Sequence, residues 1–243
     1  MNEVEAPVPP KPKSQVKPKA SRKVKPVRVV ERTEVFSNLP VSDPEDQQQL
    51  IAVLQQQIRS YVAIQGYEAE QPLLEQALAD IERFHGGQLR RSGQPVIIHP
   101  LRVARYICQA GLDAPTVIAS LLHDTIEDTE TLPEELEAAF GPEVRDLVLE
   151  VSDDKTRVKK ERKRLQIEGA PGLSHAAQLI RISDKCCNIR DMAESPPADW
   201  SVSWQLNYLD WAEQVVRALE GTHPGLESCF KTLCAEVRAH LQA

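Results

Sequence analysis

One short segment gathers side chains that can bind a metal ion and activate water. The stretch "LLHDTIEDT" carries His123, Asp124, Glu127 and Asp128 directly after two leucines. Imidazole and carboxylate groups bind divalent transition metals, and a carboxylate can also accept a proton from water. A bound cation would offset the repulsion among neighbouring acids. The segment is therefore a candidate metal centre; the alternative from this segment alone is an acidic, exposed helix face.

Two other segments offer matching ligands. "PVIIHP" ends with His99 and a proline at the expected start of a helix, and "ISDKCCNIRD" places Asp184 and Asn188 on one helical face. Because Ile182 and Ile189 flank that face, Asp184 should be partly buried and should need a partner. Two histidines and two aspartates form a mixed shell suited to Mn²⁺, Fe²⁺ or Zn²⁺, and open coordination positions for water would make it catalytic.

The elements that must position these residues are all helices. Apolar residues recur at helical spacing, glycine and proline punctuate the pattern, and no alternating strand pattern or phosphate-binding glycine motif is found. We expect an all-α protein. The predicted helices cover residues 43–65, 71–84, 99–111, 113–128, two shorter helices within 132–154 on either side of Gly141, 175–193, 201–221, and a short last helix from Gly225.

The segment 113–128 is predicted to be one continuous helix that begins at the N-cap Asp113. At about 100° per residue, its apolar side chains cover one half of the helical wheel. The four polar side chains of the metal segment share the other half, with His123 one turn before Glu127.

Charge divides the chain into two parts. Residues 1–35 hold 9 Lys+Arg against 4 Glu, a net charge of +5, so residues 36–243 hold 20 Lys+Arg against 32 Asp+Glu, a net charge of −12. The front is rich in Pro and Lys and poor in large apolar residues, and we expect residues 1–42 to be a disordered basic tail. The tail is either a solubilising extension or a contact for nucleic acid or an acidic surface. Residues 43–243 should form one folded domain.

The composition indicates the cellular compartment in which the protein works. No stretch has the length of a membrane span, and the N-terminus lacks the apolar run of a signal peptide. The five cysteines form no CxxC pair and are too few for a disulfide framework in a chain of 243 residues. We expect a cytoplasmic protein with reduced thiols and no membrane contact; the sequence carries no signal for an oligomeric state.

The adjacent His123–Asp124 pair, with His99 upstream and Asp184 downstream, resembles the metal shell of the HD phosphohydrolase superfamily. The segments "GQLRRSGQPVIIHP", "LLHDTIEDT", "VSDDKT" and "SDKCCNIRD" together resemble the hydrolase domain of RelA/SpoT-type alarmone enzymes. The likeness runs from about residue 67 to residue 221, and we expect no synthetase domain beside it. It is nearest in layout to the single-domain small alarmone hydrolases and implies an HD-domain helical bundle.

The resemblance implies a reaction and roles. The reaction would be Mn²⁺-dependent removal of the 3′-pyrophosphate from guanosine tetra- or pentaphosphate, which gives GDP or GTP and pyrophosphate; Fe²⁺ and Zn²⁺ are the alternative metals. Glu127 and Asp128 match the family's catalytic acidic pair, which would orient and deprotonate water. The implied metal ligands are His99, His123, Asp124 and Asp184. The implied contacts to the nucleotide are Arg90, Arg91, Thr156, Lys159, Asn188 and Tyr208.

Several positions depart from the family pattern and leave the substrate open. The chain has Val96 where relatives have Tyr, Ser183 where they have Ala, and Cys186–Cys187 where they have Leu and an aromatic residue or His. These changes put the choice of nucleobase in doubt, so an adenosine alarmone ((p)ppApp) or the 2′-phosphate of NADPH are alternative substrates. A non-catalytic alarmone-binding module is the alternative of another class, although an intact acidic pair argues against it.

Overall fold

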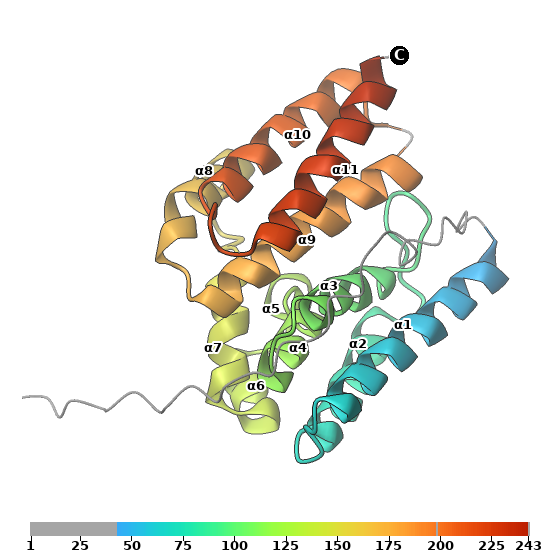
Figure 1. Cartoon of the computed structure of the whole chain (residues 1–243), viewed down its shortest axis with the longest axis vertical. Helices are drawn as coiled ribbons and strands as arrows, with labels where there is room; N and C mark the ends of the chain where they lie inside the picture. Colours follow the sequence, from blue (N-terminus) through green and yellow to red (C-terminus); the bar gives the residue numbers. More distant parts are fainter. Residues whose placement is uncertain (1–42, 198, 243) are drawn as a thin grey trace, which may run out of the picture.

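The structure, a computed structural model, describes residues 43–197 and 199–242, and this part of the chain is helical without any β-strand (Figure 1). The predicted all-α class is confirmed. The predicted tail, residues 1–42, lies outside the described residues. The α-helices are α1 (Pro44–Ile64), α2 (Gln71–His85), α3 (Ile98–Gln109), α4 (Ala114–Leu121), α5 (Thr125–Asp128), α6 (Pro133–Phe140), α7 (Pro142–Val151), α8 (Lys159–Gly169), α9 (His175–Glu194), α10 (Val202–Arg217) and α11 (Pro224–Gln242).

Helix α9 runs through the middle of the bundle. It packs against α3, α4 and α7 on one side and against α10 and α11 on the other (Figure 1). Its apolar residues Ile180, Ile182 and Ile189 are fully buried. A helix that is covered on nearly all sides must give each of its polar side chains a partner inside the protein. The polar residues of α9 therefore indicate where a functional site could lie.

The first turn of α3 and the last turn of α4 lie close to α9. Helix α3 packs against α1, α4 and α9, so His99 in its first turn is buried. Helix α4 begins as predicted: the Asp113 carboxylate accepts a hydrogen bond from the Thr116 backbone N–H at 3.1 Å. This cap and Pro115 in the first turn fix the start of α4. Its last turn leads directly into the metal segment.

The predicted continuous helix over residues 113–128 is wrong. Helix α4 ends at Leu121 and α5 begins at Thr125, with Leu122 at φ −98° and ψ 4°. The His123 ring explains the break, because its Nδ1 lies 2.8 Å from the carbonyl oxygen of Ser120, a group that an unbroken helix would use for the backbone ladder. In an unbroken helix, neighbouring side chains diverge by about 100°. The break instead lets His123 and Asp124 face the same point.

The C-terminal helices cover the other side of α9. The sequence predicted a short last helix from Gly225. Helix α11 instead has 19 residues. Its buried residues Phe230, Cys234 and Val237 pack into the main core with α9. Among the described helices, none is both long enough and apolar enough to cross a lipid bilayer.

Candidate active site

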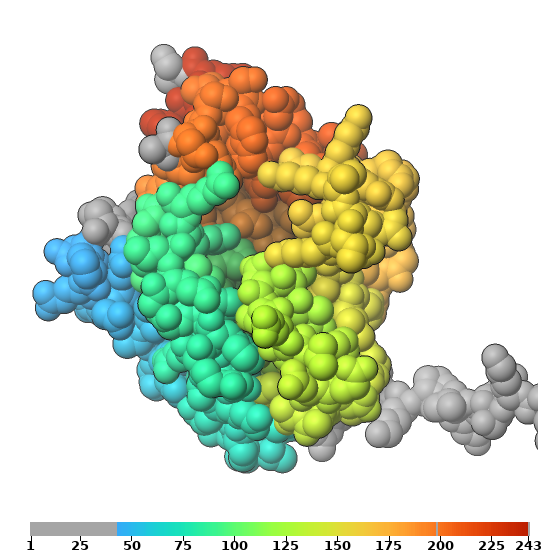
Figure 2. Space-filling view, turned by 180° about the vertical axis from the view of Figure 1, so that it is seen from behind, coloured from blue at the N-terminus to red at the C-terminus, as the bar shows by residue number. Residues whose placement is uncertain are grey.

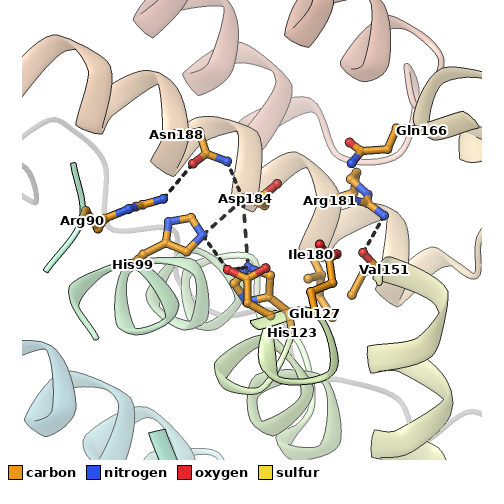
Figure 3. Close-up of a pocket in the computed structure, with 11 residues that line it drawn as sticks. Arg90, His99, His123, Glu127, Val151, Gln166, Ile180, Arg181, Asp184 and Asn188 are labelled. Atoms are coloured by element: carbon orange, nitrogen blue, oxygen red, sulfur yellow. Dashed lines mark hydrogen bonds and ion pairs between the residues drawn. The ribbon is translucent and has the colours of Figure 1, made fainter. Parts of the chain in front are cut away.

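Four side chains from three separate segments of the chain converge where α3, α4 and α9 meet, and Figure 3 shows His99, His123 and Asp184 of this set. The Nε2 atom of His99 lies 3.2 Å from Asp184 Oδ1 and 3.6 Å from Asp124 Oδ2. The Nε2 atom of His123 lies 3.2 Å from Asp124 Oδ2 and 4.0 Å from Asp184 Oδ1. The structure therefore brings together the four residues that the sequence singled out as metal ligands.

The donor atoms of this cluster fit a divalent cation. His123 Nδ1 lies 2.8 Å from the Ser120 carbonyl oxygen and donates to it, which directs Nε2 toward the carboxylates. That Nε2 is buried and has no hydrogen-bond partner. One donor atom each from His99, His123 and Asp124 lies within 4.8 Å of the other two. A divalent cation would take the place of a proton on this Nε2.

Electrostatics in the cluster favour positive charge. Burial alone would lower the pKa of His123, but Asp124 and Asp184 outweigh burial and raise that pKa to about 9. Burial also opposes ionisation of both carboxylates, yet His123 holds the pKa of Asp124 below its usual range, and Lys185 does the same for Asp184. Burial lowers the pKa of His99. The two carboxylates are thus ionised at neutral pH and can bind a cation.

A second layer of polar groups fixes Asp184. The Asn188 amide donates to Asp184 Oδ1 at 2.6 Å, and the buried Lys185 ammonium lies 2.8 Å from Asp184 Oδ2. Arg90 donates in turn to Asn188 Oδ1 at 3.3 Å and pairs with Asp191. Asp191 also approaches His99, since its Oδ2 lies 3.8 Å from His99 Nδ1. Such contacts orient ligands and preserve their charge.

The cluster opens into a cavity of about 200 Å³ whose lining includes Glu127. Glu127 Oε1 accepts a hydrogen bond from the Asp153 backbone N–H at 2.7 Å, which holds the carboxylate in place. Burial raises the pKa of Glu127 to about 7. Asp128 does not line this cavity: its side chain is 46% exposed and pairs with Lys155. The two acids that look equivalent in the sequence therefore have different surroundings.

The predicted nucleotide contacts divide into two groups. Arg90 and Asn188 line the cavity. Arg91 points away, with 74% of its side chain exposed and Nη1 3.0 Å from Asp199 Oδ2. Thr156 is also outside the lining, and its hydroxyl donates to Asp154 at 2.6 Å. The structure thus brings only part of the predicted contact set to the cavity.

Lys159 and Tyr208 lie beside the cavity rather than in it. Tyr208 stacks on Trp204 with ring centroids 5.7 Å apart, and Lys159 Nζ lies 5.4 Å from the centroid of a Trp204 ring. Tyr208 and Trp211 also pack against the core. Figure 2 shows a hollow between α8 (yellow), α10 (orange) and the green segment that follows α2. Helix α8 lies at the rim of the site because its Gln166 lines the cavity, and α10 packs against α8 and α9.

Sequence reasoning missed four polar residues at this site. Lys185 and Asp191 support the cluster, and Gln166 and Arg181 line the cavity. A signal for Arg181 and Asp191 was present: they lie three residues before and seven residues after Asp184, on the same helical face. No comparable signal existed for Gln166, which reaches the cavity from α8.

The departures from the family pattern do not reach the cavity. Val96, Ser183, Cys186 and Cys187 are all absent from its lining, and the last three are fully buried. Their effect is therefore on packing behind the cluster.

The chain is similar to several known proteins. Residues 77–207 match the family model described as HD domain. The chain is 46% identical over 172 residues to the human protein named guanosine-3′,5′-bis(diphosphate) 3′-pyrophosphohydrolase MESH1, a match that covers 69% of this chain and 95% of that protein.

Two solved structures are also similar. One, described as a metazoan ortholog of SpoT that hydrolyzes ppGpp, matches with a TM-score of 0.64 and 36% identity over 67% of this chain and 93% of that one. A protein from Listeria monocytogenes EGD-e matches with a TM-score of 0.52 and 29% identity over 60% of this chain and 99% of that one. The family match spans more than half of the chain, and its histidine and aspartate cluster is assembled in space: the chain belongs to the HD-domain family.

Proposed function

We propose that this protein hydrolyses the 3′-pyrophosphate of guanosine tetra- and pentaphosphate ((p)ppGpp) to GDP or GTP and pyrophosphate. The observation that carries the proposal is the convergence of His99, His123, Asp124 and Asp184 next to the half-buried carboxylate of Glu127. The named activity of the human relative supports the choice of substrate. Residues 43–243 would form the hydrolase domain, preceded by the basic tail.

The four clustered side chains would hold one divalent cation, with Mn²⁺ as the first candidate and Fe²⁺ or Zn²⁺ as alternatives. A bound divalent cation would make a neighbouring water more acidic and would polarise a phosphate oxygen. Histidine and carboxylate donors suit all three metals. Lys185 and Asn188 would keep Asp184 oriented toward the cation, because each contacts one of its two oxygens.

Glu127 would act as the general base. Water would transfer a proton to its carboxylate and form a bond to the phosphorus next to the 3′-oxygen. The bond from that phosphorus to the 3′-oxygen would break, and the 3′-oxygen would keep the electron pair and take a proton from solvent. The products are a nucleotide with a 3′-hydroxyl group and free pyrophosphate. Asp128 would contribute by holding Lys155, and with it the segment that follows α7.

Arg90 and Asn188 would contact the substrate inside the cavity. Arg91, Thr156, Lys159 and Tyr208 would act at the rim, where phosphates and the base of a longer ligand could reach them. A pure binding module would have no need of a general base such as Glu127 beside the cluster, so the enzyme is the better proposal. All five cysteines are unpaired, which supports a reducing compartment such as the cytoplasm.

A side-by-side assay tests this function. Purified protein, with and without added Mn²⁺, is given the guanosine alarmone, the adenosine alarmone and NADPH at equal concentration. We expect Mn²⁺-dependent release of pyrophosphate from the guanosine alarmone at the highest kcat/KM. Faster release of phosphate from NADPH, or preference for the adenosine alarmone, would replace the proposed substrate while leaving the chemistry in place.

The pH dependence of turnover should follow Glu127. Burial raises the pKa of this carboxyl group to about 7, and a bound cation would lower it, so the acid limb should have its midpoint at or below about pH 7. Below the midpoint, kcat/KM should fall because the base is protonated. The check is a pH–rate profile of the natural protein and of Glu127→Gln. An acid limb of unchanged position and slope in Glu127→Gln would assign the base to another group.

A further inference from the structure

Arg181 is a buried cation without a carboxylate partner in the described part of the chain. Only 8% of the residue is exposed, its Nη2 donates to the Val151 carbonyl oxygen at 2.7 Å, and its Nε has no hydrogen-bond partner. The other buried cations are neutralised: Arg102 pairs with two carboxylates and Lys185 pairs with Asp184. A buried charge without a counter-ion is costly, which points to an anion that the protein binds in use.

The guanidinium lies at one end of the cavity that contains the cluster. Arg90 and Asn188 line one end, the histidines and Asp184 lie between, and Arg181 with Gln166 lines the opposite end (Figure 3). The amide nitrogen of Gln166 is bound to Asp153, while its buried Oε1 has no partner. Both ends therefore carry an arginine.

The two ends differ in access. The Arg90 side chain is 28% exposed, whereas Arg181 is buried against the backbone of α7. A volume of about 200 Å³ is also below the ~300–1,000 Å³ of pockets that enclose a whole drug-sized ligand. Only the reacting end of a nucleotide can enter, and the nucleoside must remain on the side of Arg90.

We propose that Arg181 forms the subsite for the terminal phosphoryl group of the 3′-pyrophosphate, and therefore for the pyrophosphate product. This inference rests on the proposed function. A terminal phosphate is a chain end with three oxygens, so it suits the closed end of the cavity, and a guanidinium offers a planar set of donors to it. The distance along the cavity would then place the inner phosphorus beside the metal cluster and Glu127.

The test measures pyrophosphate and GDP binding separately. Isothermal titration with sodium pyrophosphate, and in a second run with GDP, is carried out on the full chain with Mn²⁺ for the natural protein, Arg181→Gln and Arg181→Lys. A charged hydrogen-bond partner contributes ~1.5–3 kcal/mol, so Arg181→Gln should weaken pyrophosphate binding by about 10- to 150-fold and leave GDP binding within about twofold. Arg181→Lys keeps the positive charge, so its loss of pyrophosphate affinity should be smaller than that of Arg181→Gln.

Two controls separate binding from structure. Arg238→Gln removes a half-buried arginine that pairs with Asp210 and Glu213 on α10, outside the cavity, and it should change neither affinity. Because Arg181 also caps α7 through Val151, thermal unfolding is measured without ligand. Arg181→Lys retains a donor for that carbonyl oxygen. It replaces Arg181→Gln in the binding test if the glutamine variant does not fold.

The outcomes separate the subsite from the function. Pyrophosphate affinity within twofold of the natural protein in a folded Arg181→Gln variant would overturn the subsite and leave the hydrolase assignment intact. Equal losses for pyrophosphate and GDP would also overturn it. Arg181-dependent pyrophosphate binding in a protein that hydrolyses no alarmone would support the subsite and overturn the proposed function.

Discussion

Replacing Glu127 by Gln should lower kcat for pyrophosphate release by about 10²- to 10⁴-fold, the contribution usual for a general base. Glutamine has the same shape, and its Oε1 can still accept the Asp153 N–H, so the fold and the cavity should be unchanged. The loss would then reflect the missing proton acceptor. Initial rates at saturating substrate and Mn²⁺ measure it, and thermal unfolding confirms that the variant is folded.

Asp128→Asn is the matched control for this prediction. Asp128 is the next residue in the chain and the other acid of the pair, but it is half exposed and pairs with Lys155 outside the cavity. We expect a loss of less than about tenfold, as for a residue that acts through a neighbour. Equal losses in the two variants would show that both acids handle the water, and full turnover in Glu127→Gln would remove Glu127 from the mechanism.

The second large effect is expected from His123→Ala. This change removes the imidazole whose free Nε2 faces Asp124 and Asp184, so Mn²⁺ affinity should fall by more than about 100-fold. Turnover should fall by about a thousandfold or more, since a catalytic metal contributes several kcal/mol. Metal content after dialysis and the Mn²⁺ dependence of the rate measure the two effects.

His85→Ala provides a comparison with equal loss of volume. His85 is also a buried histidine, with 4% of the residue exposed, but it lies at the end of α2 and does not line the cavity. Its removal should leave Mn²⁺ affinity unchanged. If both histidine variants lost the metal to the same degree, general destabilisation rather than ligand loss would explain the result.

Much of the site could be predicted because the chemistry of its ligands is local in the sequence. His123 and Asp124 are adjacent, and Asp184 stands between buried isoleucines, where only a partnered carboxylate is tolerated. The helix pattern also located His99 at the start of α3. The break after Leu121 could not be predicted, because it depends on a side-chain contact between His123 and a backbone carbonyl, whereas the helical period continues through it.

The nucleotide contacts were harder to predict because the direction of a long side chain depends on tertiary neighbours. Arg90 and Arg91 are adjacent in a loop, and only the structure shows that Arg90 turns inward to Asp191 while Arg91 turns outward to Asp199. Gln166 reaches the cavity because α8 packs near α10, a contact that no local pattern encodes.

One divalent cation should be shared by residues from three separate parts of the chain. The most direct measurement is anomalous diffraction from crystals soaked in Mn²⁺. We expect a single peak per chain at about 2.0–2.3 Å from His99 Nε2, His123 Nε2 and an oxygen each of Asp124 and Asp184. The absence of this peak in crystals that still release pyrophosphate from guanosine tetraphosphate would contradict the account.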